Sequence, residues 1–375
     1  MKVAIVHEWL DTYAGSERVL EQMLAVFPEA DLYALCDFLP ESERGFLGGR
    51  TPRTTFIQRL PFARRRFRNY LGLMPLAIES LDLAGYDLVL SSSHAVAKGA
   101  ITGPGTVHIA YVHSPMRYAW DLQAQYLRES GLERGIKGAY VRWLLHRLRL
   151  WDQASAARPD AILANSSYVA ERIRKAWRRE AEVLHPPVDT EAFSVGTEPR
   201  THYLVASRLA PYKRVDLVVA AFRHMPGRRL VVVGDGPQRA QVHAAAAGAP
   251  NIDLRGHVPR SELVRLMRTA RAFVFAAEED FGIALVEAQA CGTPLIAFGR
   301  GGARDIVRTP ETGAEPTGIL FAEQSVEAIV AAVERFEAEA SRFTPHACRA
   351  NAERFSIARF RQGLRDAVAR HLAHA

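Results

Sequence analysis

The chain has few of the residues that cross-link small secreted domains. Only three cysteines occur among its 375 residues, Cys36, Cys291 and Cys348, and none forms a CxxC pair. An odd number of widely spaced cysteines argues against a disulfide framework and suits a reducing compartment. Long hydrophobic runs are missing as well, because no apolar stretch approaches the about 18 residues of a membrane-spanning helix. We therefore expect a cytoplasmic protein that crosses no bilayer.

Several motifs that carry known chemistry are also missing. The sequence contains no G-x-G-x-x-G dinucleotide fingerprint and no G-x-x-x-x-G-K-[ST] phosphate loop. It has no D-x-D pair to clamp a divalent metal, no histidine pair of the metalloprotease type and no G-x-S-x-G elbow. These absences argue against the classes of enzyme that depend on such motifs.

Acidic residues are missing from two long stretches of the chain. Lysine and arginine outnumber aspartate and glutamate by 48 to 41, which gives a formal net charge of +7. Residues 45–78 and 134–151 contain no acid, and apolar and aromatic residues are interleaved with their arginines. A basic amphipathic helix with aromatic residues can lie on an anionic membrane. The alternative is a solvated helix whose apolar face packs on its own domain.

The membrane interpretation supplies a set of candidate contact residues for a membrane or an acceptor. They are Arg64, Arg65, Arg66, Arg68, Arg142 and Trp143. Nucleic acid suits the charge less well, because no recognised RNA- or DNA-binding motif accompanies these arginines. We expect a monomer or weak dimer in the cytoplasm, with the inner face of the membrane as a candidate attachment surface.

Short apolar runs alternate with longer helical patterns along the chain. Several runs are continuous Val, Ile, Leu and Ala, which is typical of strands buried on both faces of a parallel sheet. The alternation predicts an α/β fold with doubly wound sheets. We expect strands at 2–7, 88–91, 108–112, 161–165, 203–207, 229–233, 252–255, 272–276, 295–297 and 318–321.

The alternation starts twice, which predicts two domains, 1–190 and 200–355. Between them, residues 185–200 are rich in proline, threonine and acidic residues, and their lack of periodicity indicates a linker. The last segment, 356–375, has apolar residues at helical spacing. The length also exceeds what one hydrophobic core usually serves.

Residues 276–307 hold the most informative motif. Glu279 and Glu287 flank Gly282, which lies where a strand should give way to a helix. The start of a helix offers free N–H groups and a positive dipole end, suited to an anion or to sugar hydroxyls. Two carboxylates so placed could reach different hydroxyls of one ligand. The spacing is common by chance, so two surface glutamates are the alternative.

Three further motifs follow predicted strands. Arg208 and Lys213 lie in a loop that leads into a helix, where two cations can neutralise a diphosphate, although a solvated basic loop would look the same. Gly15 opens the first helix, and Gly234 lies in a strand-end turn that permits close backbone approach. His113 follows a strand, a position where a structural histidine is more common than a catalytic one.

Taken together and in this order, these motifs resemble glycosyltransferase family 4. The resemblance covers essentially the whole chain. Its elements are the glycine loop at Gly15, R-L-x-x-x-K from Arg208 to Lys213, E-x-F-G-x-x-x-x-E from Glu279 to Glu287, and the ACGTP that follows. It implies the GT-B fold, in which two Rossmann-like domains face a cleft and a C-terminal helix crosses back to the N-terminal, acceptor-binding domain. The second domain would bind the nucleotide-sugar donor.

The resemblance also implies roles for single residues. Arg208 and Lys213 would hold the donor diphosphate, and Glu287 would bond the donor ribose. His113 would border the anomeric carbon as a positioning group. The other donor contacts would be Glu279 to sugar hydroxyls, with Gly15, Gly234, Phe281, Gly282, Ile283 and Ala284 as close backbone neighbours. Three positions depart from the family pattern, namely Ala14, Arg214 and Asp280, where glycine is usual.

The reaction implied by the resemblance is a metal-independent, cofactor-free transfer that retains anomeric configuration by a front-face mechanism. Several short segments of the sequence resemble those of bacterial mannosyltransferases in polysaccharide assembly. It favours GDP-mannose as donor and a lipid-diphosphate-linked saccharide as acceptor, while UDP-glucose, UDP-galactose and dTDP-rhamnose stay open. Two alternatives remain: a nucleotide-sugar 2-epimerase on the same fold, and a non-catalytic scaffold that binds nucleotide sugar or glycan.

Overall fold

The computed structural model describes residues 1–373, which form two units. The first unit comprises Met1–Pro187 and the end of the chain from Phe360 onward, and the second comprises Val188–Arg359. Val188 and Phe193 are buried in the core of the second unit. These two residues, which lie in the stretch that we interpreted as a linker, therefore belong to that core.

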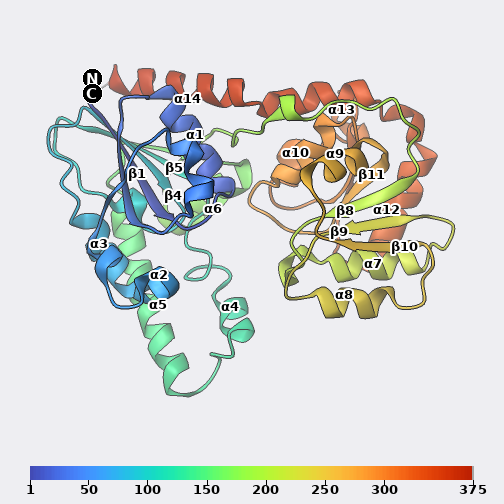
Figure 1. Cartoon of the computed structure of the whole chain (residues 1–375), viewed down its shortest axis with the longest axis horizontal. Coiled ribbons are helices and arrows are strands. Elements are labelled where there is room, and N and C mark those ends of the chain that lie inside the picture. The colour runs from blue at the N-terminus through green and yellow to red at the C-terminus, as the bar shows by residue number, and fades with distance from the viewer. Residues whose placement is uncertain (374–375) are drawn as a thin grey trace. The chain divides into compact units, whose positions relative to one another are not determined.

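The first unit is built on a seven-stranded parallel sheet (Figure 1). Its order is β3-β2-β1-β4-β5-β6-β7, so the direction of winding reverses between β1 and β4. Doubly wound folds bind ligands outside the carboxyl ends of the strands at such a point. The strands are β1 (Val3–Leu10), β2 (Asp31–Asp37), β3 (Arg53–Thr54), β4 (Leu88–Ser93), β5 (Val107–Val112), β6 (Ala161–Ala164) and β7 (Glu182–Val183).

Helices cover this sheet, and the last helix of the chain is one of them. Phe360, Leu364 and Val368 pack into the core beside β1 and β5, and the Phe360 ring meets Tyr111 edge-on at 5.7 Å. The helices are α1 (Gly15–Val26), α2 (Ala63–Arg66), α3 (Met74–Glu79), α4 (Gln123–Glu129), α5 (Gly135–Ser155), α6 (Ser167–Trp177) and α14 (Ile357–Leu372), with short 3-10 turns that include η3 (Phe67–Leu73) and η4 (Ala97–Gly99).

The second unit repeats the plan on a six-stranded parallel sheet of order β10-β9-β8-β11-β12-β13. Its strands are β8 (His202–Ala206), β9 (Leu230–Val233), β10 (Ile252–Gly256), β11 (Ala270–Phe275), β12 (Leu295–Phe298) and β13 (Gly318–Phe321). Its helices are α7 (Val215–Arg223), α8 (Arg239–Ala246), α9 (Arg260–Arg268), α10 (Ile283–Ala290), α11 (Ala303–Ile306), α12 (Val326–Ala338) and α13 (Pro345–Ala352), with 3-10 turns that include η6 (Pro211–Lys213) and η9 (Glu353–Phe355). The winding reverses between β8 and β11.

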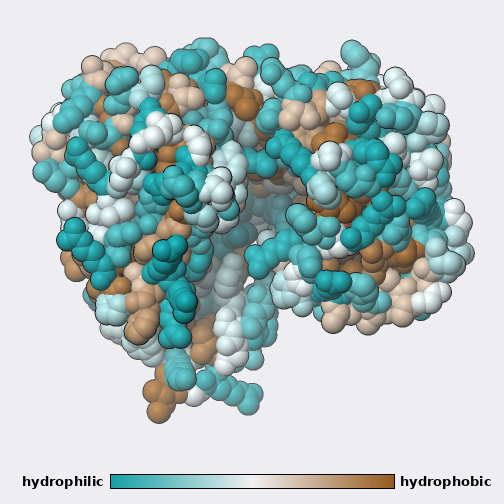
Figure 2. Space-filling view, in the orientation of Figure 1, coloured by the Kyte–Doolittle hydropathy of each residue, from teal (hydrophilic) through white to brown (hydrophobic). Residues whose placement is uncertain are grey.

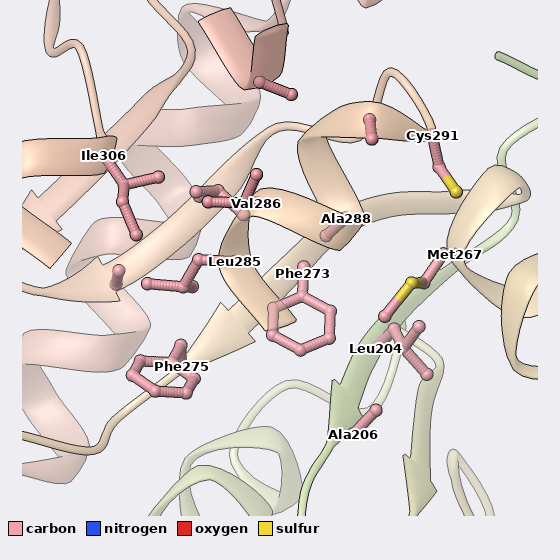
Figure 3. Close-up of a cluster of buried hydrophobic side chains, with 14 of the residues drawn as sticks. Leu204, Ala206, Met267, Phe273, Phe275, Leu285, Val286, Ala288, Cys291 and Ile306 are labelled. Atoms are coloured by element: carbon pink, nitrogen blue, oxygen red, sulfur yellow. The ribbon is translucent and has the colours of Figure 1, made fainter. Parts of the chain in front are cut away.

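A buried cluster fixes α10 against this second sheet (Figure 3). Leu285 and Val286 are fully buried, and Leu285 points toward Phe275 at the end of β11. Burying side chains of this size contributes about 2 kcal/mol each. The start of α10 is thereby held at the carboxyl edge of the sheet. Within residues 1–373, no helix is both long and apolar enough to cross a membrane.

Candidate functional site

The loop before α10 is shaped by glycine. Gly282 has a φ of +99°, in the region that L side chains rarely adopt, and a Cβ there would lie 3.1 Å from Leu285. The chain can therefore turn sharply from β11 into α10 only with glycine at this position. The first N–H groups of α10, from Ile283 and Ala284, have no carbonyl one turn earlier to bond. They form a small group of donors at the edge of the sheet.

Lys213 and Glu279 form an ion pair across the same edge. Lys213 ends η6 after β8, and Glu279 precedes α10 after β11, so the two residues come from the neighbouring strands where the winding reverses. Both side chains are mostly but not wholly buried. A charge pair that keeps some access to solvent can exchange partners when a charged ligand arrives. The structure thus brings together two site residues predicted from separate motifs.

Two other predicted residues flank this pair on the same elements. Arg208 is exposed on the loop between β8 and η6. Glu287 is half-buried at the fifth position of α10, just over one turn from its start. Two cations, two carboxylates and the beginning of a helix therefore belong to the segments that follow β8 and β11, and the contact between Lys213 and Glu279 joins these segments. Such a set suits a ligand with both phosphate and hydroxyl groups.

Glycine pairs hold the two loops of this site in place. A Cβ on Gly234 would lie 1.8 Å from the Ser207 carbonyl oxygen, and one on Gly236 would lie 2.5 Å from that of Leu209. The loop that carries Arg208 fills the space of the missing Gly234 side chain, so packing explains this glycine, while its contact with the donor stays a prediction. Sequence reasoning missed a second pair, Gly301 and Gly302, although the run GRGG was a visible signal.

That second pair supports the Glu279 loop. A Cβ on Gly301 would lie 2.2 Å from the Glu279 carbonyl oxygen, and one on Gly302 would lie 2.3 Å from the Phe281 Cα. The Gly302 N–H also donates to the Glu279 carbonyl at 2.9 Å. Any larger residue at either position would push the loop that carries Glu279 away.

Arg214 occupies the position after Lys213 where the family pattern has glycine. Its φ is +51° and its ψ is +36°, which is the left-handed region. This conformation costs a non-glycine residue about 1 kcal/mol. The backbone of Arg214 therefore has the conformation that a glycine at this position would adopt without strain.

The first unit presents a different arrangement at Gly15. Gly15 is the first residue of α1, and the Glu17 carboxylate accepts hydrogen bonds from the Ala14 N–H at 3.0 Å and the Ser16 hydroxyl at 2.9 Å. The other Glu17 oxygen lies 3.3 Å from His7 Nε2. Burial opposes ionisation, but the hydrogen bond and charge of His7 outweigh it and lower the pKa of Glu17 to about 2. The Ala14 N–H at the start of α1 is therefore already bonded to a buried carboxylate of the same helix.

His113 follows β5 and bonds to Ser92 at the end of β4. Its Nε2 lies 2.9 Å from the Ser92 hydroxyl. Burial, followed by the neighbouring histidines His94 and His7, lowers the pKa of His113 to about 3. The imidazole is therefore neutral near pH 7, which suits a positioning group better than an acid.

Glu8 was not singled out from the sequence. Its buried carboxylate accepts the Ser93 hydroxyl and four successive backbone N–H groups at 2.7 to 3.0 Å, those of His94, Ala95, Val96 and Ala97. Burial raises its pKa, but the charge of His94 and these hydrogen bonds bring the net shift below the usual value. The N–H groups of the loop after β4 are thus bonded to a carboxylate of the protein itself.

A second buried charge network lies next to that loop. Lys98 in η4 forms an ion pair with Asp152 of α5 at 2.9 Å, and both side chains are inaccessible to solvent. The indole N–H groups of Trp120 and Trp177 each donate to the Asp152 carboxylate at 2.7 Å. Sequence reasoning missed this network, since its members are 25 to 54 residues apart from Asp152 along the chain.

The predicted membrane residues do not share one environment. Arg64, Arg65 and Arg66 are exposed on α2, and Trp143 is exposed on α5. Arg142 donates to the Glu133 carbonyl. Arg68 instead binds Asp11 at 2.6 Å and lies against the Phe67 ring, so its charge is already engaged at the sheet edge. The Arg68 side chain is nevertheless 61% exposed, so its contact with a membrane stays a prediction.

Two family models match the chain, one over each half. The model described as Glycosyltransferase Family 4 matches residues 13–192, and the one described as Glycosyl transferases group 1 matches residues 189–355. The second match includes the whole arrangement around Lys213 and Glu279. The first includes Glu17 and His113.

Curated relatives match a smaller part of the chain. D-inositol 3-phosphate glycosyltransferase of Mycobacterium sp. (strain KMS) is 31% identical over 179 residues, which are 41% of this chain and 40% of the relative. The protein of the same name from Mycobacterium tuberculosis (strain ATCC 25177 / H37Ra) is 32% identical over 182 residues, 42% of this chain and 38% of the relative. The match thus spans about two fifths of the length of these relatives.

Solved structures match the fold over nearly the whole chain. HepE of Anabaena, in complex with UDP, has a TM-score of 0.67 at 16% identity, covering 98% of this chain and 100% of that chain. Sucrose-phosphate synthase from Thermosynechococcus elongatus has a TM-score of 0.71 at 16% identity, covering 100% of both chains. At these identities the likeness shows the fold, which is GT-B with two Rossmann-like parallel-sheet domains, as the sequence predicts.

Proposed function

Because the chain carries the domains of glycosyltransferase family 4 and of glycosyl transferases group 1, we propose that it is a retaining glycosyltransferase. It would move a hexose from a nucleotide sugar to a saccharide acceptor. The observation that carries this proposal is the Lys213–Glu279 ion pair beside Arg208 and the start of α10. These groups offer cations for a diphosphate and a carboxylate for hydroxyl groups.

The chemistry follows from where charge develops. As the bond between sugar and diphosphate breaks, negative charge grows on the leaving diphosphate. Arg208, Lys213 and the first N–H groups of α10 would stabilise that charge, which is the kind of contribution that usually dominates such reactions. Lys213 would exchange its Glu279 partner for a phosphate oxygen, and Glu279 would then be available for sugar hydroxyls.

Retention without a metal is part of the proposal. The resemblance implies a front-face departure and attack, in which the leaving diphosphate itself accepts the proton of the acceptor. A neutral His113 can orient a hydroxyl beside the anomeric carbon without donating a proton to the leaving group. This assigns positioning to the first unit and charge stabilisation to the second.

For the donor we favour GDP-mannose, and for the acceptor a lipid-diphosphate-linked saccharide of cell-surface polysaccharide synthesis. The support is the resemblance of the segments around Gly15, His94, His113 and Lys213 to those of bacterial mannosyltransferases. The solved complexes of HepE contain UDP or UDP-glucose, and the curated relatives are D-inositol 3-phosphate glycosyltransferases. Uridine nucleotides are therefore the main competing donors.

Thermal unfolding with GDP, UDP, dTDP and ADP tests the donor. A ligand that binds only the folded state raises the unfolding temperature, and at equal concentration the tighter ligand raises it more. We expect the largest rise with GDP. A larger rise with UDP would replace GDP-mannose by a uridine sugar and leave glycosyl transfer intact, whereas no rise with any nucleotide would overturn the proposal.

The same purified protein separates the two alternatives. A nucleotide-sugar 2-epimerase would convert donor without an acceptor, and chromatography of the sugar would show the epimer. A non-catalytic scaffold would bind a nucleotide but turn over no donor with any acceptor. A glycosyltransferase should release nucleoside diphosphate only when an acceptor accompanies the donor, apart from slow hydrolysis.

A further inference from the structure

Helix α5 has two apolar faces instead of one. One face carries Leu145 and Leu148, which are buried against the first unit. The other carries four large apolar residues that remain in solvent: Ile136 is 91% exposed, Tyr140 60%, Trp143 57% and Leu150 51%. Because these four recur every three, four or seven residues, they form one stripe along the helix. We call them the outer stripe.

Packing on the first unit therefore does not account for the outer stripe. At 1.5 Å per residue, the stripe from Ile136 to Leu150 is about 21 Å long. The rings of Tyr140 and Trp143 stack on each other with centroids 6.0 Å apart. An exposed apolar stripe of this length is unusual on a free surface and marks a place of contact.

Positive charge surrounds the outer stripe. Residues 134–151 contain no acid, and Arg147 lies on the stripe itself between Trp143 and Leu150. Arg142 and Lys137 stand on either side of it. Long arginine and lysine side chains can keep their charge in a headgroup layer while the neighbouring apolar groups go deeper.

The basic segment before α5 continues this surface on one flank. A Cβ on Gly72 of η3 would lie 3.0 Å from Leu144 of α5, so the two segments are in contact there. Leu73 and Leu76 follow along the chain and are exposed, as is Phe62 at the start of α2. Figure 2 shows hydrophobic atoms at the lowest end of the molecule, where Figure 1 draws the beginning of α5.

We propose that the outer stripe, with Phe62 and the α2 arginines Arg64, Arg65 and Arg66, docks the first unit on an anionic lipid surface. The helix would lie in the plane of the membrane, with the stripe among the acyl chains and the arginines at the phosphates. Charge complementarity selects this occupant. A second copy paired face to face through the same surface would bring two acid-free basic surfaces together, which opposes association.

The docking surface is independent of glycosyl transfer, since vesicle binding requires neither donor nor turnover. The test is co-sedimentation of the full chain with vesicles of phosphatidylglycerol and phosphatidylcholine, and with vesicles of phosphatidylcholine alone. We expect binding to the anionic vesicles at low salt and its weakening as salt rises. Absence of binding to anionic vesicles at low salt would overturn the proposal.

Two sets of variants locate the contact. The triple change Ile136→Ser, Tyr140→Ser and Trp143→Ser should weaken partition at least about 100-fold, because three large apolar side chains no longer leave water. Changing Arg64, Arg65 and Arg66 to Gln should weaken it about fivefold per arginine at low salt. The control changes Ile101→Ser and Val183→Ser, which remove exposed apolar residues elsewhere on the first unit, should have no effect.

Other results would place the surface elsewhere. Unchanged vesicle binding by the triple variant, with circular dichroism like that of the wild type, would exclude the outer stripe as the membrane contact. Light scattering that shows a wild-type dimer, lost in the triple variant while vesicle binding persists, would assign the stripe to a second copy and overturn the proposal.

Discussion

The charges bound to the loop after β4 in the first unit, called the first edge, and those that follow β8 and β11 in the second unit, called the second edge, are arranged in opposite ways. In the first unit Glu8, Lys98 and Asp152 are shut away from solvent, and each is satisfied by groups of the same unit. In the second unit Lys213, Glu279 and Glu287 keep part of their surface in solvent. Folding has already committed the charges of the first edge, whereas those of the second can still change partners.

This difference suggests a division of labour between the units. Buried and fully bonded charges specify the shape of loops, because removing one partner leaves the other without compensation. Partly exposed charges cost less to rearrange and can bind a ligand. We therefore expect substitutions at the first edge to act on stability, and those at the second edge to act on catalysis or binding.

The largest effect should come from Lys98→Met, which leaves the Asp152 carboxylate buried without its cation. We expect the free energy of unfolding of the first unit to fall by about 3–5 kcal/mol. All five tryptophans, Trp9, Trp120, Trp143, Trp151 and Trp177, lie in the first unit, so urea unfolding followed by tryptophan fluorescence reports on it alone.

Arg158→Met is the matched control for that change. Arg158 pairs with Glu79 at 2.6 Å, but about a quarter or more of each side chain is exposed. A pair with this access to solvent should contribute only about 1 kcal/mol. Equal losses of unfolding free energy in Lys98→Met and Arg158→Met would contradict the comparison. Buried charge pairs of the first unit would then stabilise it no more than exposed pairs do.

Lys213→Ala should have the next largest effect, on turnover instead of stability. Removing a group that stabilises the leaving diphosphate should lower kcat about 10²–10³-fold. The change is measured with saturating donor and acceptor, next to Arg223→Ala, which removes an exposed cation from α7 of the same unit. Wild-type turnover in Lys213→Ala would remove Lys213 from the reaction and with it the distinction between the two edges.

The pH dependence of Glu17→Gln sharpens the comparison further. The pKa of Glu17 is lowered from its usual value of 4.5 to about 2. A lowered folded-state pKa contributes stability that is present above pH 4.5 and is lost as the pH falls toward 2. Near pH 7 the free energy of unfolding of the wild type should exceed that of Glu17→Gln by up to about 3 kcal/mol. The two free energies should converge near pH 2.

Tryptophan fluorescence again restricts this measurement to the first unit. Glu311→Gln is a useful control, because the pKa of Glu311 is also lowered to about 2, chiefly by Arg335, but Glu311 belongs to the second unit. It should leave the tryptophan transition unchanged at every pH. A difference in free energy of unfolding between the wild type and Glu17→Gln that does not depend on pH would contradict this prediction. The variant would then lose stability through packing and not through charge.

The sequence predicted the architecture and the second edge better than the first. Alternating apolar runs located the strands that are continuous in Val, Ile and Leu, but β2, with the sequence DLYALCD, carries acids at both ends and was missed. The motif residues Lys213 and Glu279 meet because parallel strands end at one edge, a rule that needs no coordinates.

Long-range partners explain what sequence reasoning missed. Glu8 is bound by amides more than eighty residues away, and backbone N–H groups leave no trace in the residue types. Arg68 looked like its neighbours Arg65 and Arg66, yet only Arg68 reaches Asp11. Apolar and aromatic residues between the arginines of α5 were visible in the sequence, but which of them would be buried depended on packing within the first unit.

The smallest effect should come from Glu287→Ala, at the second edge. The ribose that Glu287 is expected to bond is distant from the reacting bond, so its contacts should be equally strong in the ground state and the transition state. Such uniform binding affects KM and nucleotide affinity but leaves kcat nearly unchanged. Losing hydrogen bonds to a charged group should weaken the nucleotide about tenfold or somewhat more, as measured by calorimetry. As a control, Glu334→Ala on the exposed face of α12 should change neither KM nor nucleotide affinity.

A fall in kcat at constant KM in Glu287→Ala would instead place Glu287 at the reacting sugar. Both carboxylates of the second edge would then act in the transition state.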